Sequence, residues 1–95
     1  MEAEKDIQAK ILKFLRTIEQ SFAYKNHASG MYSVKGIPDI TFIWQGKAYY
    51  FEVKRPGCKP TKLQQATIDK LNQSGAAACV VFCVDDVKRV LKLDN

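Results

Sequence analysis

The sequence is poor in the soft metal ligands that a zinc protein needs. It contains one His and three Cys among 95 residues, the cysteines form no C-x-x-C pair, and with a single His a Cys/His zinc site is not expected. This usage fits a reducing compartment best. Cys79 and Cys83 lie inside the apolar run ACVVFCV, so we expect both to be buried in a core strand as small hydrophobic residues.

Long hydrophobic segments, repeats and linkers are also missing. No apolar run approaches the roughly 18 residues of a membrane span, and the charged start MEAEKDIQAK lacks the apolar region of a secretory signal. With no internal boundary, a chain of 95 residues predicts one domain over 1–95. We therefore expect a cytoplasmic protein, of a bacterial or phage-infected cell, with no membrane partner and a modest core.

Acidic residues are in the minority. Fifteen Lys and Arg against ten Asp and Glu give a formal net charge of +5. This excess favours a polyanionic partner such as nucleic acid. A solvated basic surface would give the same charge, so composition alone does not decide between the two.

The periodicity of the apolar residues predicts an α/β domain with a mixed sheet. An amphipathic helix comes first, followed by a weak strand, a long loop, a hairpin turning at Gln45-Gly46, a second helix, a strand buried on both faces, and a short helix capped by Asp85 or Asp86. The first helix is expected over 3–20, the weak strand over 21–26 and the loop over 27–39. The hairpin joins 37–44 to 47–54. The second helix covers 61–75, the buried strand 76–84 and the short helix 85–91. The order is αβββαβ with one further helix.

Three charged residues occur along the most hydrophobic hairpin. If Gln45-Gly46 is a two-residue turn, Trp44 faces Lys47, and the same register places Asp39 directly opposite Glu52. Directly opposed side chains share one face of the sheet, and Lys54 projects from that face too.

Two carboxylates that are this close repel each other unless positive charge lies between them. A divalent cation such as Mg²⁺ or Mn²⁺ would serve, because both prefer hard oxygen ligands, and the backbone carbonyl of Val53 could complete the set. A cross-strand ion pair, in which Lys54 neutralises Asp39 and Glu52, explains the spacing equally well.

Four sequence elements together resemble a known nuclease family. GIPD (36–39) and FEVKR (51–55) resemble the PD-(D/E)XK signature, and the αβββαβ order is that of the restriction-endonuclease-like core. An acidic residue on the first helix and a T-x-x-Q motif on the next helix make the sequence more similar still to the VRR-NUC, or virus-type replication-repair nuclease, family. The likeness spans nearly the whole chain, as in a standalone member.

The resemblance implies a metal-dependent site. Asp39, Glu52 and the Val53 carbonyl would bind Mg²⁺ or Mn²⁺, and Lys54 would act on the attacking water and the developing negative charge. It also implies that Glu4 is an auxiliary ligand, although Glu4 could simply favour the helix dipole and Glu2 is a rival.

A site role for Gln64 likewise has an alternative. Thr61-x-x-Gln64 is a capping box, in which Gln64 bonds back to the Thr61 backbone. Gln64 also shares a helical stripe with Ile68 and Leu71, so it can face the site.

The basic residues Lys35, Arg55, Lys59 and Lys62 flank the motifs and are expected to contact DNA phosphates, unless they form only a solvated rim.

The function that the resemblance implies is cleavage of branched DNA, as by a Holliday-junction resolvase, without a small-molecule cofactor. A less selective nicking or flap nuclease, or a non-catalytic DNA-binding module, are the alternatives. Two-fold symmetry of a junction favours a homodimer, and the aromatic residues Phe22, Tyr24 and Tyr32 are candidates for its interface.

Overall fold

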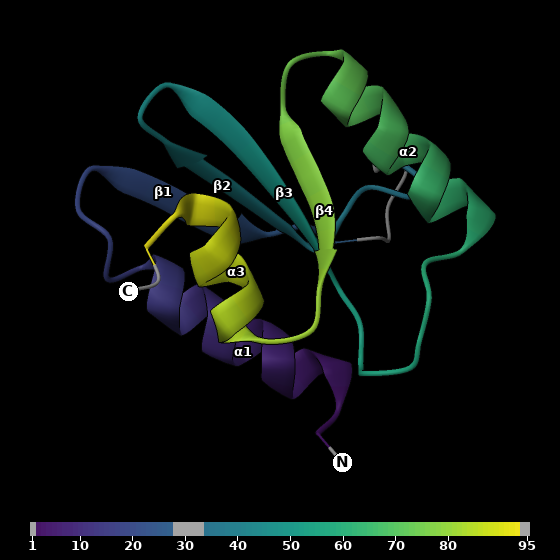
Figure 1. The fold of residues 1–95 in the computed structure, drawn as a ribbon, viewed down its shortest axis with the longest axis horizontal. Coiled ribbons are helices and arrows are strands. Elements are labelled where there is room, and N and C mark those ends of the chain that lie inside the picture. The colour runs from purple at the N-terminus through teal and green to yellow at the C-terminus, as the bar shows by residue number, and fades with distance from the viewer. Residues whose placement is uncertain (1, 28–33, 94–95) are drawn as a thin grey trace.

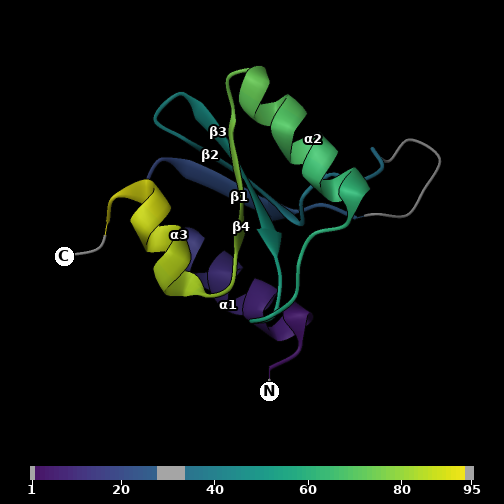
Figure 2. The same ribbon diagram turned by 45° about the vertical axis from the view of Figure 1, so that its right-hand side comes forward.

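The computed structural model of the chain describes residues 2–27 and 34–93. A four-stranded sheet lies between helices on its two sides (Figures 1 and 2). The elements are α1 (Glu4–Leu15), β1 (Ser21–Lys25), β2 (Ile40–Trp44), β3 (Lys47–Val53), α2 (Lys62–Gln73), β4 (Ala77–Val81) and α3 (Val84–Leu91). The predicted αβββαβ order with a further helix is therefore confirmed, as is the mixed sheet.

The register of the hairpin is the one that its turn predicts. The strands run in the order β1-β2-β3-β4, antiparallel except for the parallel pair β3-β4. Trp44 pairs with Lys47, and the two turn residues Gln45 and Gly46 both have positive φ, at 52° and 74°. Two consecutive residues of positive φ are the mark of a type I′ turn, whose twist matches that of the strands.

The two faces of the sheet are covered unequally. On one face, α1 and α3 pack together over the strands and enclose the core around Ile11, Phe42 and Phe51. On the other face, α2 packs mainly against β4 (Figure 1). Much of the outer face of β1 and β2 is left open, and Phe22, Tyr24 and Ile43 are exposed there.

The C-terminal part of the chain corrects three predictions. The strand is shorter than 76–84, and only Ala78 and Val81 within it are buried, so the strand is not enclosed on both faces along its length. Cys83 is exposed and is the N-cap residue of α3, so it is not a core residue, while Cys79 is half-buried. Asp86 lies inside the helix, where its carboxylate accepts a hydrogen bond from the backbone N–H of Phe82 at 2.8 Å.

The first helix ends earlier than predicted. It stops at Leu15, and a turn follows in which Gln20 takes a left-handed conformation (φ 55°) before β1 begins. By contrast, α2 has the predicted N-cap, Thr61, and Gly75 follows its last turn with φ 99°. None of the helices in the described ranges is long and apolar enough to span a membrane.

Candidate metal and nucleic-acid site

The hairpin brings the three predicted site residues together. β2 and β3 pair Ile40 with Phe51, and the next step of the same register places Asp39 opposite Glu52. Asp39 is fixed on both sides, because its carbonyl accepts a hydrogen bond from the Asn26 N–H (2.7 Å) and its Oδ2 accepts one from the Val53 N–H (2.8 Å). Lys54 follows β3 directly and is half-buried.

Glu52 is a buried carboxylate in an unfavourable environment. Its residue is only 2% exposed, and its Oε1 has no hydrogen-bond partner. Lys54 Nζ lies 3.8 Å from the other carboxylate oxygen, which is longer than a good hydrogen bond. Burial, followed by the neighbouring Asp39 carboxylate, raises the pKa of Glu52 from 4.5 to about 8, against the opposing effect of Lys54. The ion pair alone therefore leaves the carboxylate poorly compensated.

The orphaned oxygen of Glu52 fits a hard divalent cation. Two carboxylates on one rung of the sheet, with the Val53 carbonyl beside them, offer the oxygen ligands that Mg²⁺ and Mn²⁺ prefer. Within residues 2–27 and 34–93, no three acidic, His or Cys side chains group closely enough to hold a metal. A cation at this position would thus have two carboxylate ligands and fill its remaining positions with carbonyl, water or phosphate oxygens, which is usual for Mg²⁺.

The surroundings of Gly36 explain why the GIPD motif begins with glycine. Its φ is +79°, and a Cβ added at this position would lie 2.7 Å from the Thr67 hydroxyl and 3.0 Å from the Leu63 backbone carbonyl. Only a residue without a side chain allows the loop to approach α2 this closely. The approach fixes the path of the chain just before Pro38 and Asp39.

Asn26 is a site residue that the sequence analysis missed. Its side-chain amide donates to the carbonyl of Pro38 (2.9 Å) and to the Thr41 hydroxyl (2.8 Å), while its backbone N–H donates to Asp39. It therefore holds both ends of the segment that carries the Asp39 carboxylate. No sequence signal marked it, because an Asn after a weak strand is an ordinary loop residue.

The electrostatic contacts of the two acidic residues at the start of the chain distinguish Glu4 from Glu2. Glu4 is close enough to raise the pKa of Glu52, although it is the weakest of the contributors. Glu2 instead forms an exposed ion pair with Lys10 at 2.5 Å. One turn after Glu4, Gln8 is buried with its Oε1 unpaired. The effect on the pKa of Glu52 therefore favours Glu4 over Glu2 as the acidic residue nearer the carboxylates.

Gln64 forms the capping box that was the alternative to a site role. Its Oε1 accepts from the Thr61 N–H at 2.9 Å, and its own N–H donates to the Thr61 hydroxyl at 3.1 Å. The side-chain oxygen is thereby engaged at the start of α2, and no contact between Gln64 and the carboxylates is recorded in the described residues.

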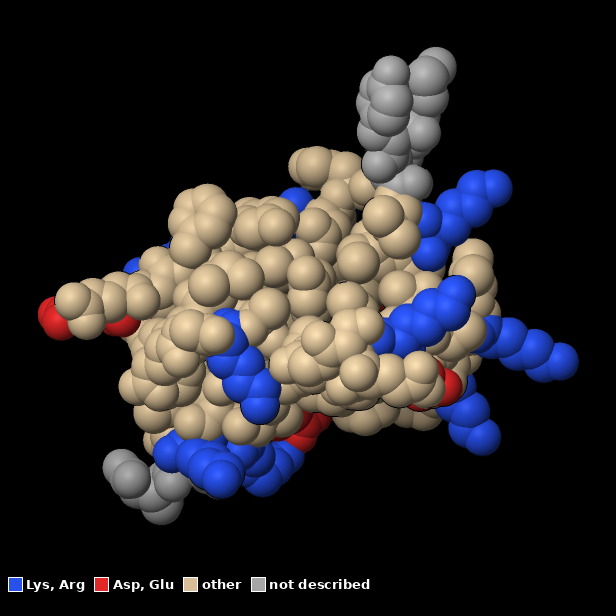
Figure 3. Space-filling model, turned by 90° about the horizontal axis from the view of Figure 1, so that it is seen from above, with Lys and Arg blue, Asp and Glu red and all other residues tan. Residues whose placement is uncertain are grey.

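The predicted phosphate-contacting residues are all solvent-exposed. The four residues are Lys35, Arg55, Lys59 and Lys62. Figure 3 shows Lys and Arg side chains that project from the end of the molecule where α2 lies, and others at the opposite end. Their heads are free to reach a polyanion, as phosphate contacts require.

Two solved structures described as VRR_NUC domains share the fold of this chain. One has a TM-score of 0.76 at 21% sequence identity, covering 94% of each chain. The other has a TM-score of 0.72 at 20% identity, covering 96% of this chain and 86% of that one. No family model matches the sequence, and neither does any curated protein. The chain is thus an α/β domain with the fold of VRR_NUC domains.

Glu52→Gln should stabilise the metal-free protein at high pH. The pKa of Glu52 is raised on folding, so wild-type stability is full below about pH 4.5 and falls as pH rises toward about 8. Gln carries no charge to bury, so the variant should not show this loss. Thermal unfolding in EDTA from pH 4 to 9 measures the difference, which should grow with pH. Exposed Glu19→Gln is the control, and equal pH profiles for wild type and Glu52→Gln would contradict the assignment.

Asn26→Ala should destabilise the protein and also loosen Asp39. Leaving the acceptors without their donor costs about 1–3 kcal/mol, and losing a group that orients a ligand typically weakens metal binding by roughly tenfold or more. Asn72→Ala is the matched control, since Asn72 makes the same kind of bonds to Ala78 between α2 and β4. Calorimetric titration with Mn²⁺ should separate them: both variants lose stability, and only Asn26→Ala loses metal affinity.

Proposed function

We propose that this chain is a member of the VRR-NUC family and a Mg²⁺- or Mn²⁺-dependent endodeoxyribonuclease. The observation that carries the proposal is the pair Asp39 and Glu52, held on one rung of the hairpin with Lys54 beside it. The pair occurs on a fold shared with VRR_NUC domains. A phosphodiester nuclease needs charge neutralisation at the scissile phosphate and an activated water, which this set of residues can provide.

Each residue has a distinct role in this proposal. A bound divalent cation would supply charge neutralisation and a more acidic water. Asp39 and Glu52 hold the cation, with the Val53 carbonyl, and Val53 N–H and Asn26 keep Asp39 in place. Lys54 orients the attacking water and stabilises the negative charge that develops on the phosphate. Glu4 acts through bound water, and Gln64 chiefly fixes the start of α2, which carries Lys62 toward the DNA.

A comparison of Asp39→Asn with Lys54→Ala should separate the effect on metal binding from the effect on catalysis. Each should lower Mg²⁺-dependent nicking of a supercoiled plasmid by roughly a hundredfold or more, and EDTA should abolish nicking by wild type. Only Asp39→Asn should also weaken Mn²⁺ binding, because Lys54 is not a ligand. Wild-type nicking by Asp39→Asn would refute the metal site. Absence of any metal-dependent nicking, with DNA binding intact, would favour the non-catalytic DNA-binding module.

Phosphate contacts by the basic residues predict DNA binding that weakens steeply with salt and depends little on duplex sequence. Lys62→Ala should reduce the slope of log affinity against log salt by about 1. Lys13→Ala removes an exposed charge at the far end of α1 and should leave the slope unchanged. Fluorescence anisotropy without divalent metal measures both. A salt-independent affinity would exclude the proposed phosphate contacts.

Branched DNA is the proposed substrate, and a homodimer is the proposed assembly. β1 is an edge of the sheet, with Phe22 64% and Tyr24 41% exposed and their rings 5.4 Å apart. Because the Asn26 N–H points to β2, the N–H groups of Lys25 and Ala23 point outward and can pair with another strand. Tyr32, the third aromatic residue predicted for the interface, lies outside the described residues.

Antiparallel pairing of two β1 strands would suit a resolvase. The two-fold axis then stands perpendicular to the joined sheet, so both carboxylate pairs lie on the same side of the dimer. Two symmetric strands of a junction could be cut there by one assembly. A monomer could cut only one strand at a time, as a nicking or flap nuclease does.

Phe22→Lys should convert the dimer to a monomer, because it sets like charges against each other along the edge. Ile43→Lys is the control: Ile43 pairs directly with Phe22 and is also exposed, at 40% against 64%, but it lies on the inner strand β2. Light scattering should give a monomer for the first variant and a dimer for the second. Cruciform cleavage should change from paired cuts to single nicks with Phe22→Lys. A monomeric wild type that makes only single nicks would remove the resolvase proposal and favour the nicking nuclease.

A further inference from the structure

A row of side chains lies next to the carboxylates on the open face of the sheet. Tyr24 pairs with Thr41, and Thr41 pairs with Tyr50, so the three residues form one rung across β1, β2 and β3. The next rung along the same strands and on the same face contains Asn26, Asp39 and Glu52. Two residues of a strand span about 7 Å, so this row and the proposed metal site are immediate neighbours.

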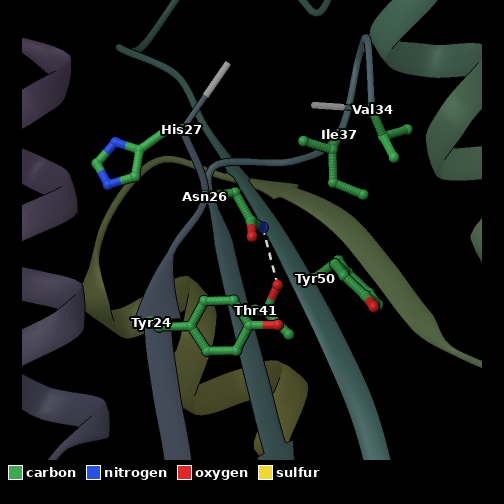
Figure 4. A pocket seen from close by; sticks show the side chains of 7 residues that line it. All are labelled: Tyr24, Asn26, His27, Val34, Ile37, Thr41 and Tyr50. Atoms are coloured by element: carbon green, nitrogen blue, oxygen red, sulfur yellow. Dashed lines mark hydrogen bonds between the residues drawn. The ribbon is translucent and has the colours of Figure 1, made fainter. Parts of the chain in front are cut away.

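A cavity of about 290 Å³ opens over this row. Figure 4 shows Tyr24 and Tyr50 on either side of Thr41, with Asn26 above it and Ile37 and Val34 at the rim. His27 completes the lining. Thr41 forms a fixed floor, because it is 2% exposed and its hydroxyl accepts the hydrogen bond from Asn26. The volume is near the lower end of small-ligand pockets, roughly 300–1,000 Å³.

The chemistry of the lining matches a nucleobase better than a phosphate. Among the described residues, no Lys or Arg lines the cavity. Two phenol rings and the aliphatic Ile37 and Val34 offer surfaces for a flat ring, and Asn26 and the phenol hydroxyls offer polar atoms for its edge. Aromatic side chains bind bases by stacking without needing a particular sequence.

We propose that this cavity binds an unpaired nucleobase of the DNA strand whose backbone crosses Asp39 and Glu52. The inference rests on the proposed function, because the proposed cleavage reaction places one phosphate of that strand at the carboxylates. A base within a continuous duplex is stacked between its neighbours and cannot enter a pocket without being extruded. The cavity therefore favours DNA with an unpaired nucleotide at the cleavage position, as occurs where strands branch.

Asn26 joins the two halves of this site. Its backbone N–H holds Asp39, and its side chain borders the cavity and fixes the Thr41 floor. A base seated against Asn26 would thus lie beside the segment that carries a metal ligand. The sugar and phosphate of the same nucleotide would bridge the short distance between the two rungs.

The test measures binding without cleavage. Three ligands are compared in EDTA: a single-stranded 12-mer carrying one 2-aminopurine, its fully paired duplex, and the mononucleotide dAMP. Each is titrated with wild type, Tyr50→Leu, Tyr50→Phe and Phe82→Leu. Tyr50→Leu should weaken single-strand binding by roughly 5- to 150-fold, the range for one base stack, and leave duplex binding almost unchanged. Tyr50→Phe keeps the ring and should retain affinity. Phe82→Leu removes an exposed aromatic ring outside the cavity and should also retain it.

Four results would overturn the proposal. They are unchanged single-strand affinity of Tyr50→Leu, an equal loss for duplex, no change of 2-aminopurine fluorescence on binding, and tighter binding of dAMP than of the oligonucleotide, which would indicate a small-molecule pocket. If Tyr50→Leu does not fold by circular dichroism, Tyr24→Leu at the exposed edge replaces it. Because EDTA prevents metal-dependent cleavage, the outcome is independent of the nicking assay: nicking with an inert pocket refutes only this inference, and base binding without nicking refutes only the nuclease.

Discussion

The burial of one carboxylate beside another is the constraint on which the arrangement of this domain depends. Glu52 is 2% exposed and lies opposite Asp39, and its one ion pair within the described residues is a long one to Lys54. A structure that served stability alone would replace such a group by an apolar residue, since a poorly paired buried charge is costly. The surrounding features, from the hairpin turn to Asn26 and Gly36, fix the position of this pair rather than relieve its repulsion.

The raised pKa of Glu52 links that cost to ligand binding. Because the pKa of Glu52 is raised by burial and by Asp39, its carboxyl group keeps a proton to higher pH than an exposed carboxyl group does in the metal-free protein. A cation that binds the carboxylate must displace this proton, so binding and deprotonation are coupled and affinity increases with pH. If the proposed cation site is occupied, the ion would recover the free energy lost by burying the group. In that proposal the domain gives up stability at the position where it would bind a cation.

The sequence predicted the site as far as local rules determine geometry. Gln45-Gly46 fixes a two-residue turn, and a turn of known length sets the register, so Asp39 could be placed opposite Glu52 without coordinates. Thr61 and Gln64 likewise form the capping box that their spacing encodes. What failed depended on packing between distant segments. Cys83 looked like a core residue because its neighbours are apolar, but the strand ends at Val81 where the chain turns into α3. Asn26 was missed because its hydrogen-bond partners, Pro38 and Thr41, lie 12 and 15 residues later in the sequence, beyond a loop whose path local rules do not determine.

The unequal covering of the sheet leaves open the side of β1 and β2 beside Asp39, as the proposed DNA substrate would require. The hydrophobic side of the hairpin is closed by α1 and α3, and this is where Phe42, Phe51 and Val53 supply the core. The alternate residues of the same strands, Thr41, Tyr50 and Glu52, face the other way, where α2 packs mainly on β4. A third layer over β1 and β2 would add buried area to a small domain, at the expense of access to Asp39 and Glu52. Because side chains of a strand alternate between its faces, one hairpin supplies both the core and the candidate site. A shift of the strand register by one residue would move the core residues to the open face and the site residues into the core.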